Sequence, residues 1–257
     1  MNNFTFILPV RVDSAYREAN IKAICDFYSR DRSFKISIVE ADSIPRLKNL
    51  LSNYRTVDYT FIEDKETVFH RTKYINIMMR NTSDQYAAIW DADVIAPIQQ
   101  IIDAYSKLRQ YQEIMVYPYD GKFWDVGENI SELFKRNLDI NFLETFPYPR
   151  TLMNGYNSVG GAFLVNIEKY REVGWENENF IGWGPEDEER YHRLDILGHT
   201  PKRIKGNLYH LFHPRGINSG YFDSKVAFHT KREYCKICSL TKTELTDYIN
   251  QWSWIHL

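Results

Sequence analysis

The sequence predicts an α/β protein with a mostly parallel, doubly wound sheet and C-terminal helices. In roughly the first 97 residues, short β-branched and aromatic runs alternate with segments whose apolar residues recur at helical spacing. The connections between them are short, as they are when helices join neighbouring parallel strands. With 257 residues and 44% hydrophobic content, the chain can bury the core of one large domain.

The elements of the first half follow in order. We expect three strands and two helices before residue 63: strand 4–10, a helix from about residue 13, strand 36–41, a helix from Ser43 and Pro45 to Tyr54, and strand 57–62. Thr67 is expected to cap a helix that runs to Arg80. A fourth strand, 86–90, then ends at Asp91 and Asp93. The carboxyl ends of these strands should form a ligand crevice.

The second half is less regular. Its predicted elements are helix 98–111, strand 114–118, strand 162–166, helix 167–173, helix 186–197, a strand before His210 and a last helix that begins at a Thr241 to Glu244 capping box. Segment 119–156, rich in Pro, Gly and Asn, is expected to be an irregular insertion that faces an acceptor. Cys235 and Cys238 are expected on the packing face of a helix, because a second pair with zinc-ligand spacing is missing.

Composition excludes several classes of function. The 32 basic and 34 acidic residues give a net charge of −2 without a long basic block, so we expect no nucleic-acid partner. The sequence lacks a run of about 18 consecutive apolar residues, so we expect no transmembrane segment. Three cysteines leave one thiol unpaired in any disulfide scheme, which favours a reducing compartment. We therefore expect a cytoplasmic protein, and peripheral contact with the inner face of a membrane is compatible with this.

The D-x-D pair Asp91 and Asp93 is the first functional signal. An apolar strand ends there in two carboxylates, where open α/β sheets bind ligands. Hard oxygen ligands at such a position suit Mg²⁺ or Mn²⁺ carrying a diphosphate. A solvated strand end without a metal is the alternative, because D-x-D alone has little specificity.

Three further segments strengthen the metal interpretation. Residues 182–189, GWGPEDEE, lead from a flexible aromatic loop into a helix that opens with four acids, although such acids also simply suit the helix dipole. The Gly160-Gly161 pair precedes a strand, where backbone amides could approach a phosphate or sugar. His210 and His213 follow in LYHLFHPRG, and an imidazole there could complete a Mn²⁺ site begun by Asp93.

Together these segments resemble the β-1,4-galactosyltransferase group and its bacterial relatives, which are inverting enzymes of the glycosyltransferase-A fold. The resemblance covers about residues 4–215 and rests on segments that appear in the family's order: ILPVR at 7–11, FHRTKYIN at 69–76, Asp91-Ala92-Asp93, Gly160-Gly161, residues 182–188 and His213-Pro214-Arg215. It implies a single domain over 1–257, with a nucleotide-binding half to about 97, an acceptor and catalytic half at about 98–215, and a helical tail at 216–257.

The resemblance also implies a role for each matched residue. Asp187 would be the general base, Glu186 would bind acceptor or donor hydroxyls, and Trp183 would close over the donor. Asp93 and His213 would hold Mn²⁺ or Mg²⁺, with His210 the less favoured ligand. The remaining residues would contact the donor nucleotide: Pro9, Arg11, Glu40, Asp42, Arg71, Lys73, Asp91, Gly160 and Gly161. Structural alternatives stay open for Arg71 as an exposed helix cation, Lys73 as a salt-bridge partner, Asn76 as a helix anchor and His210 as a packed strand residue.

The implied reaction is transfer of a hexose or N-acetylhexosamine from a UDP-sugar to the hydroxyl of a saccharide or lipid-linked saccharide, in bacterial surface polysaccharide synthesis. Two departures from the family pattern qualify it. Pro185 replaces a loop glycine and stiffens the loop. Ser158 stands where galactose-specific relatives have an aromatic residue, which leaves room for an N-acetyl group.

Two other classes of protein remain as alternatives. An aspartyl-nucleophile phosphohydrolase would use Asp91 as the nucleophile and Asp93 as the acid/base, although its motif normally ends the first strand rather than the fourth. A non-catalytic sugar-binding module would draw on the 18 tyrosines and would not need Asp187. Phosphate release from phosphoesters, or sugar binding without nucleotide or metal, would distinguish these two.

Overall fold

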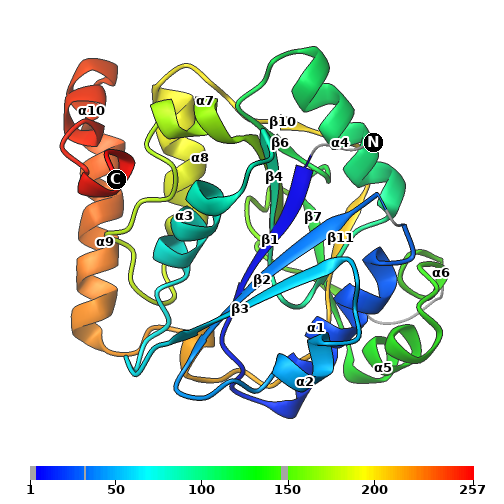
Figure 1. Ribbon diagram of the computed structural model, residues 1–257. Coiled ribbons are helices and arrows are strands. Elements are labelled where there is room, and N and C mark those ends of the chain that lie inside the picture. Colours follow the sequence, from blue (N-terminus) through cyan, green and yellow to red (C-terminus); the bar gives the residue numbers. More distant parts are fainter. Residues whose placement is uncertain (1–3, 32, 146–149) are drawn as a thin grey trace.

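A computed structural model describes residues 4–31, 33–145 and 150–257, and its centre is a seven-stranded sheet (Figure 1). The strand order is β10-β6-β9-β4-β1-β2-β3. The strands are β1 (Phe4–Val10), β2 (Lys35–Asp42), β3 (Val57–Glu63), β4 (Tyr86–Trp90), β6 (Met115–Tyr117), β9 (Ala162–Asn166) and β10 (Lys202–Arg203). Strand β9 runs antiparallel to β4 and β6, while the other neighbours are parallel, which confirms the mostly parallel sheet.

Helices cover both faces of this sheet (Figure 1). They are α1 (Ala15–Tyr28), α2 (Lys48–Leu51), α3 (Arg71–Asn81), α4 (Ile98–Gln110), α7 (Ile167–Glu172), α8 (Glu186–Ile196), α9 (Ser224–Ser239) and α10 (Lys242–Ile249). On one face, the ring of Tyr28 in α1 lies 5.0 Å from that of Phe6, centre to centre, and the ring of Tyr105 in α4 lies 4.9 Å from that of Phe4. Helices α3 and α7 to α10 lie on the other side (Figure 1).

A second, four-stranded sheet in the order β5-β11-β7-β8 corrects the prediction of an irregular insertion. Segment 119–156 contains β7 (Lys122–Val126), α5 (Glu128–Asn137), α6 (Asn141–Glu144) and β8 (Arg150–Leu152), with residues 146–149 outside the described part. Strand β7 pairs with β11 (Asn207–His210), which in turn pairs with β5 (Val94–Ile95). Local patterning missed β7 because its parallel partner, β11, lies more than 80 residues later in the chain.

Two predicted helix starts are wrong. Helix α2 begins at Lys48 rather than near Ser43 and Pro45 and is only four residues long, and α3 begins at Arg71 rather than after Thr67. The Arg11 side chain donates hydrogen bonds to the carbonyls of Glu66, at 2.7 Å, and Thr67, at 3.5 Å. These carbonyls therefore accept from Arg11, directly after β1, instead of closing a first helical turn, and a tertiary contact overrides the capping signal.

The C-terminal segment packs against the domain as predicted. Thr241 and Glu244 form the reciprocal capping box of α10, and the buried Trp252 lies against Gly174. Cys235 and Cys238 are exposed free thiols on α9, so their placement on a packing face was wrong. Two short 3₁₀ turns, Ile217–Ser219 and Ser253–Ile255, precede α9 and follow α10. Among the described residues, no helix combines the length and the apolar character needed to cross a lipid bilayer.

Candidate active site

The D-x-D pair lies at the carboxyl edge of the large sheet, directly after β4 and beside the parallel strand β1. The Asp91 N–H donates to the Gly161 carbonyl at 2.9 Å, which ties this turn to the glycine pair. The indole N–H of Trp90 donates to the Val94 carbonyl at 2.8 Å and closes the turn from inside. The two carboxylates are therefore held on a rigid buried frame.

Asp93, His210 and His213 come together, with one ligand atom from each within 4.8 Å of the others. The His213 Nε2 atom lies 3.1 Å from Asp93 Oδ2, and the His210 Nε2 atom lies 3.8 Å from Asp93 Oδ1. The Leu211 N–H donates to the Asp93 carbonyl at 2.7 Å, so the segment after β11 is fixed to the D-x-D turn. The structure brings both histidines to Asp93, where the sequence favoured His213.

The charges around Asp93 suit a divalent cation. Burial alone would raise the pKa of the Asp93 carboxyl, but the two imidazoles and the Arg17 guanidinium outweigh burial and lower this pKa. Burial alone would lower the pKa of His210, but Asp93 and Asp125 raise it. His210 Nδ1 lies 3.0 Å from Asp125 Oδ1, an arrangement that orients metal-binding imidazoles in other proteins. An ionised carboxylate with two imidazoles fits Mn²⁺.

Arg71 links the D-x-D pair to the other half of the site. One terminal nitrogen of its guanidinium, Nη2, donates to Asp91 Oδ1. The other, Nη1, is buried and has no hydrogen-bond partner among the residues that the structure describes. Arg71 is therefore not the exposed helix cation of the structural alternative. A buried donor without an acceptor is costly, which favours an anionic ligand there.

Asp187 lies in the first turn of α8 and is held by a buried arginine. Arg190, whose side chain is 0% exposed, donates to Asp187 Oδ1 at 2.8 Å. The same guanidinium donates two hydrogen bonds of 2.8 Å to Glu176 and lies 4.1 Å from the centre of the Phe163 ring. The Asp187 side chain keeps 27% exposure. One carboxylate oxygen is therefore anchored while part of the group remains accessible.

Gly160 provides room for Asp187. A Cβ atom placed on Gly160 would lie 2.4 Å from Asp187 Oδ2, well inside van der Waals contact. The sequence interpretation assigned the open space at Gly160 to a phosphate or sugar. In the structure, the Asp187 carboxylate occupies that space, and Gly161, with φ of +84°, abuts Phe123 and Leu208 instead.

Replacement Gly160→Ala should therefore displace the Asp187 carboxylate. Under the base role that the family resemblance implies for Asp187, this change should lower turnover by roughly tenfold or more, because small misplacements of a catalytic group are costly. Gly160 does not need a left-handed backbone, so the fold should persist. Steady-state kinetics and a melting curve measure both effects. Gly127→Ala is the matched control, since a Cβ there meets nothing within 4 Å. Equal activity of the two variants would contradict this role for Gly160.

Glu186 is expected to bind its proton more tightly than an ordinary glutamate. Burial and the adjacent Asp187 carboxylate raise the pKa of Glu186 well above its usual value. The Gly184 N–H donates to Glu186 Oε2 at 3.1 Å. A protonated Glu186 could donate a hydrogen bond to a ligand oxygen beside Asp187.

The pH dependence of stability tests this charge state. A raised folded-state pKa stabilises the protein fully below the unfolded-state value near 4.5, and this contribution disappears as the pH rises through the folded-state pKa. Glu186→Gln should therefore raise the melting temperature more at pH 8 than at pH 5, by about 2 °C or more, which corresponds to about 1 kcal/mol in a protein of this size. Glu168→Gln, at an exposed position on α7, is the control. A pH-independent difference would contradict the assignment.

Several predicted nucleotide contacts are engaged inside the protein. Arg11 donates to the Ala41 carbonyl at 2.9 Å and pairs with Asp64 at 2.6 Å. Glu40 is 0% exposed and accepts from the N–H groups of Arg46 and Leu47 and from the Tyr59 hydroxyl. These contacts shape the strand ends and occupy the polar groups that the sequence assigned to the nucleoside.

The other predicted contacts differ in how open they are. The Asp42 carboxylate accepts from the N–H groups of Val12 and Ser43, and Pro9 is buried within β1. Lys73 is exposed, and its ammonium lies 5.9 Å from the centre of the Tyr74 ring. Trp183 is 43% exposed and contacts the Tyr221 ring edge-on at 4.8 Å.

Asn76 anchors α3 to the chain before α8. Its amide donates to the Glu176 carbonyl and its oxygen accepts from the Glu176 N–H, as its structural alternative predicted. Arg17, Asp125, Glu176 and Arg190 were not predicted from the sequence, although each contacts a candidate site residue or its partner. The sequence around each of these residues does not indicate a functional role, because a single charged residue within a helix or strand is usually solvated.

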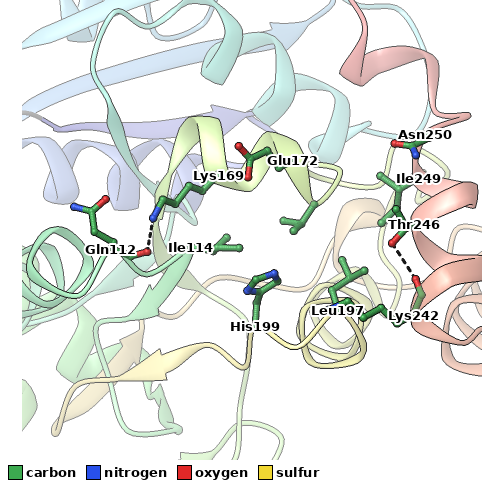
Figure 2. A pocket seen from close by; sticks show the side chains of 11 residues that line it. Gln112, Ile114, Lys169, Glu172, Leu197, His199, Lys242, Thr246, Ile249 and Asn250 are labelled. Atoms are coloured by element: carbon green, nitrogen blue, oxygen red, sulfur yellow. Dashed lines mark hydrogen bonds between the residues drawn. The ribbon is translucent and has the colours of Figure 1, made fainter.

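The cavity in Figure 2 lies elsewhere. It has a volume of about 400 Å³ and is lined by residues of α7 and α10 and by the segment after α8 that includes His199. The Lys169 ammonium points across it and donates to the Gln112 carbonyl at 2.7 Å. The lining contains none of the D-x-D, glycine-pair, acidic-loop or histidine residues.

Comparisons with known proteins show similarity to galactosyltransferases. Residues 141–214 match the family described as the N-terminal domain of galactosyltransferase. Human β-1,4-galactosyltransferase 7 is 25% identical over 182 residues, which make up 69% of this chain and 43% of the human protein. The chain therefore spans less than half the length of that relative.

Two solved structures extend the comparison to the fold. The catalytic domain of Drosophila β-1,4-galactosyltransferase 7, in complex with xylobiose, aligns with a TM-score of 0.54 at 18% identity, covering 93% of this chain and 81% of that one. Glucosyl-3-phosphoglycerate synthase of Mycobacterium tuberculosis, in complex with Mn²⁺, UDP and glucosyl-3-phosphoglycerate, aligns with a TM-score of 0.52 at 16% identity, covering 82% and 72%. The chain thus has the glycosyltransferase-A fold predicted from its sequence, and it is similar in sequence to the β-1,4-galactosyltransferases.

Proposed function

We propose that this protein is a metal-dependent, inverting glycosyltransferase that moves a hexose or N-acetylhexosamine from a UDP-sugar to a saccharide hydroxyl. The observation that carries this proposal is the convergence of three features at one edge of the sheet. A carboxylate and two imidazoles form a group suited to a cation. Beside it stand a buried arginine donor without a partner and a second carboxylate, Asp187, held by Arg190.

The residues divide the reaction between them. Asp187 would accept the proton of the attacking acceptor hydroxyl, which forms the new bond at the anomeric carbon as the bond to UDP breaks. Arg190 and Gly160 support this role because they fix the position of the carboxylate. A protonated Glu186 would donate to a hydroxyl of one of the sugars. The free Nη1 of Arg71 would donate to the diphosphate.

Asp93, His210 and His213 would hold the divalent cation, Mn²⁺ or Mg²⁺. When bound, such a cation would offset the negative charge that develops on the departing UDP. Asp91 is paired with Arg71 and would support the diphosphate side of the site rather than complete the group of three ligands. The M. tuberculosis enzyme of similar fold was solved with Mn²⁺ and UDP, which supports Mn²⁺ as the first cation to test.

We assign the donor to the part of the domain before about residue 97 and the acceptor to about 98–215, with 216–257 as a packing tail. Xylobiose in the Drosophila structure supports a saccharide acceptor. We include lipid-linked saccharides of bacterial surface polysaccharides in the acceptor class, with the protein acting in the cytoplasm at the inner face of the membrane. A screen of free and lipid-linked acceptors, read by mass spectrometry of the product, tests this part.

Thermal stabilisation by a panel of nucleotides tests the donor class, because a ligand that binds the folded protein raises its melting temperature by mass action. The panel contains UDP, GDP, CMP and several UDP-hexoses, each with and without Mn²⁺. A shift that needs both UDP and Mn²⁺ is expected. Phosphate release from simple phosphoesters would favour the phosphohydrolase instead, and stabilisation by sugars without nucleotide or metal would favour a sugar-binding module.

A further inference from the structure

Arg17 is a charged neighbour of the proposed metal ligands Asp93 and His213. Its Nη1 atom donates to Asp93 Oδ2 at 2.9 Å, and its Nη2 atom lies 3.5 Å from His213 Nε2. Its Nε atom donates to Asp13 Oδ1 at 3.2 Å. The guanidinium therefore contacts two of the atoms that would bind a cation, and a carboxylate outside the group supports it from the other side.

The proton arrangement of His213 strengthens this observation. His213 Nδ1 lies 2.9 Å from the Pro214 carbonyl, which can only accept a hydrogen bond. In the tautomer with the proton on Nδ1, which is the form that can bind a cation through Nε2, the Nε2 lone pair faces Asp93 Oδ2, 3.1 Å away. Two lone pairs at that distance repel each other unless a positive group faces both atoms. The Arg17 N–H groups are that positive group in this structure.

Burial makes the positive charge necessary. The side chains of Asp93 and His213 are 8% and 6% exposed, and that of Arg17 is 14% exposed. An ionised carboxylate at this depth is strongly destabilising without a partner. Arg17 is therefore a permanent positive charge that helps the imidazoles to balance Asp93.

The backbone of α1 is fixed beside the proposed metal ligands, whereas the Arg17 side chain has a second ion-pair partner, Asp13, outside that group. On the next turn of α1, the Asn20 amide donates to the Phe212 carbonyl at 3.3 Å, which fixes α1 against the segment that carries His213. The Arg17 side chain could leave Asp93 and keep its ion pair with Asp13, whose side chain is 21% exposed. Displacement would therefore require a side-chain movement and no change of fold.

We propose that Arg17 is the resident cation of the metal-free site, so that a divalent cation binds Asp93 and His213 only by displacing the guanidinium. This inference rests on the metal site of the proposed function. Both positive groups need Asp93 Oδ2 and the lone pair of His213, and like charges in so buried a site repel strongly. Arg17 therefore weakens the intrinsic affinity for the metal and protects the site when the metal is absent.

Mn²⁺ binding without nucleotide tests the proposal. The free Mn²⁺ signal in electron paramagnetic resonance gives the Kd of the wild type, Arg17→Met and Lys22→Met. Lys22 is the matched control, because it is an exposed cation on the same helix that pairs with Asp26. Arg17→Met should bind Mn²⁺ at least tenfold more tightly than the wild type, whereas Lys22→Met should bind like the wild type. Arg17→Met should also have a lower melting temperature without metal and a larger upward shift with Mn²⁺.

The outcomes separate this inference from the proposed function. Mn²⁺ binding by the wild type with equal or weaker binding by Arg17→Met would overturn the role of Arg17 and leave the metal site in place. Absence of Mn²⁺ binding in all variants would overturn both. If Arg17→Met does not fold, Arg17→Lys keeps the charge without the planar fork, and it should then bind Mn²⁺ more tightly than the wild type by a smaller factor; equal binding would again overturn the role.

Discussion

Asp187→Asn should lower turnover about a thousandfold while UDP-sugar binding persists. The substitution keeps the size of the side chain and an oxygen that can accept from Arg190, but it removes the charge that would take the acceptor proton. General-base catalysis typically contributes roughly 10²- to 10⁴-fold. Initial rates of transfer, together with the Kd for the UDP-sugar, separate the loss of chemistry from a loss of binding.

The control for Asp187→Asn is Asp195→Asn, at an exposed position near the other end of α8. This variant should retain wild-type turnover. If Asp187→Asn also retains it, Asp187 is not the base. If it loses both turnover and UDP-sugar binding, its main role would be in the donor pocket, and the base would be a different group.

Asp93→Asn should abolish metal binding and, with it, transfer. Asp93 supplies both carboxylate oxygens that face the two histidines, at 3.1 Å and 3.8 Å. Removal of a metal ligand should weaken the affinity for Mn²⁺ by more than the roughly 10- to 100-fold that is typical when a residue that only orients a ligand is removed. Asp125→Asn, which changes the partner of His210, should fall in that smaller range, and Asp103→Asn on α4 should bind Mn²⁺ like the wild type.

Removal of the metal by a chelator should reproduce the effect of Asp93→Asn on activity, and added Mn²⁺ should restore only the wild type. Undiminished transfer by the chelator-treated wild type would contradict a metal role for this group. In that case, Arg17 would be the positive group that pairs with Asp93 during transfer, in place of a metal ion.

The strands of the first half could be predicted because each is rich in β-branched or aromatic residues and is followed by turn residues. Strand β4, for example, was predicted with its observed bounds, Tyr86–Trp90. Strand β7 was missed, because its sequence, KFWDV, makes sense only beside β11. Thr67 looked like a helix cap, but the carbonyls there bind Arg11. Long-range pairing and tertiary hydrogen bonds are not visible in local patterns.

The candidate site was predictable where the residue type itself limits the chemistry. Asp93 could be named because paired carboxylates at a strand end indicate cation binding, and the two histidines because imidazoles can complete such a site, whereas Asp187 as the base and the preference for His213 came from the family resemblance. Arg17 and Arg190 could not be named, since an arginine in a helix is usually solvated and only the folded chain buries these two. Gly160 was named for the absence of a side chain, but the group that uses the space is Asp187.

Calorimetric titration of UDP into the wild type and Asp93→Asn, each with Mn²⁺ and with a chelator, tests the central claim most directly. If Asp93 and the two histidines hold the cation that receives the diphosphate, UDP should bind tightly only to the wild type with Mn²⁺. Equal binding of UDP in the four titrations, or no binding in any, would contradict the assignment of this edge of the sheet to a UDP-sugar and its metal.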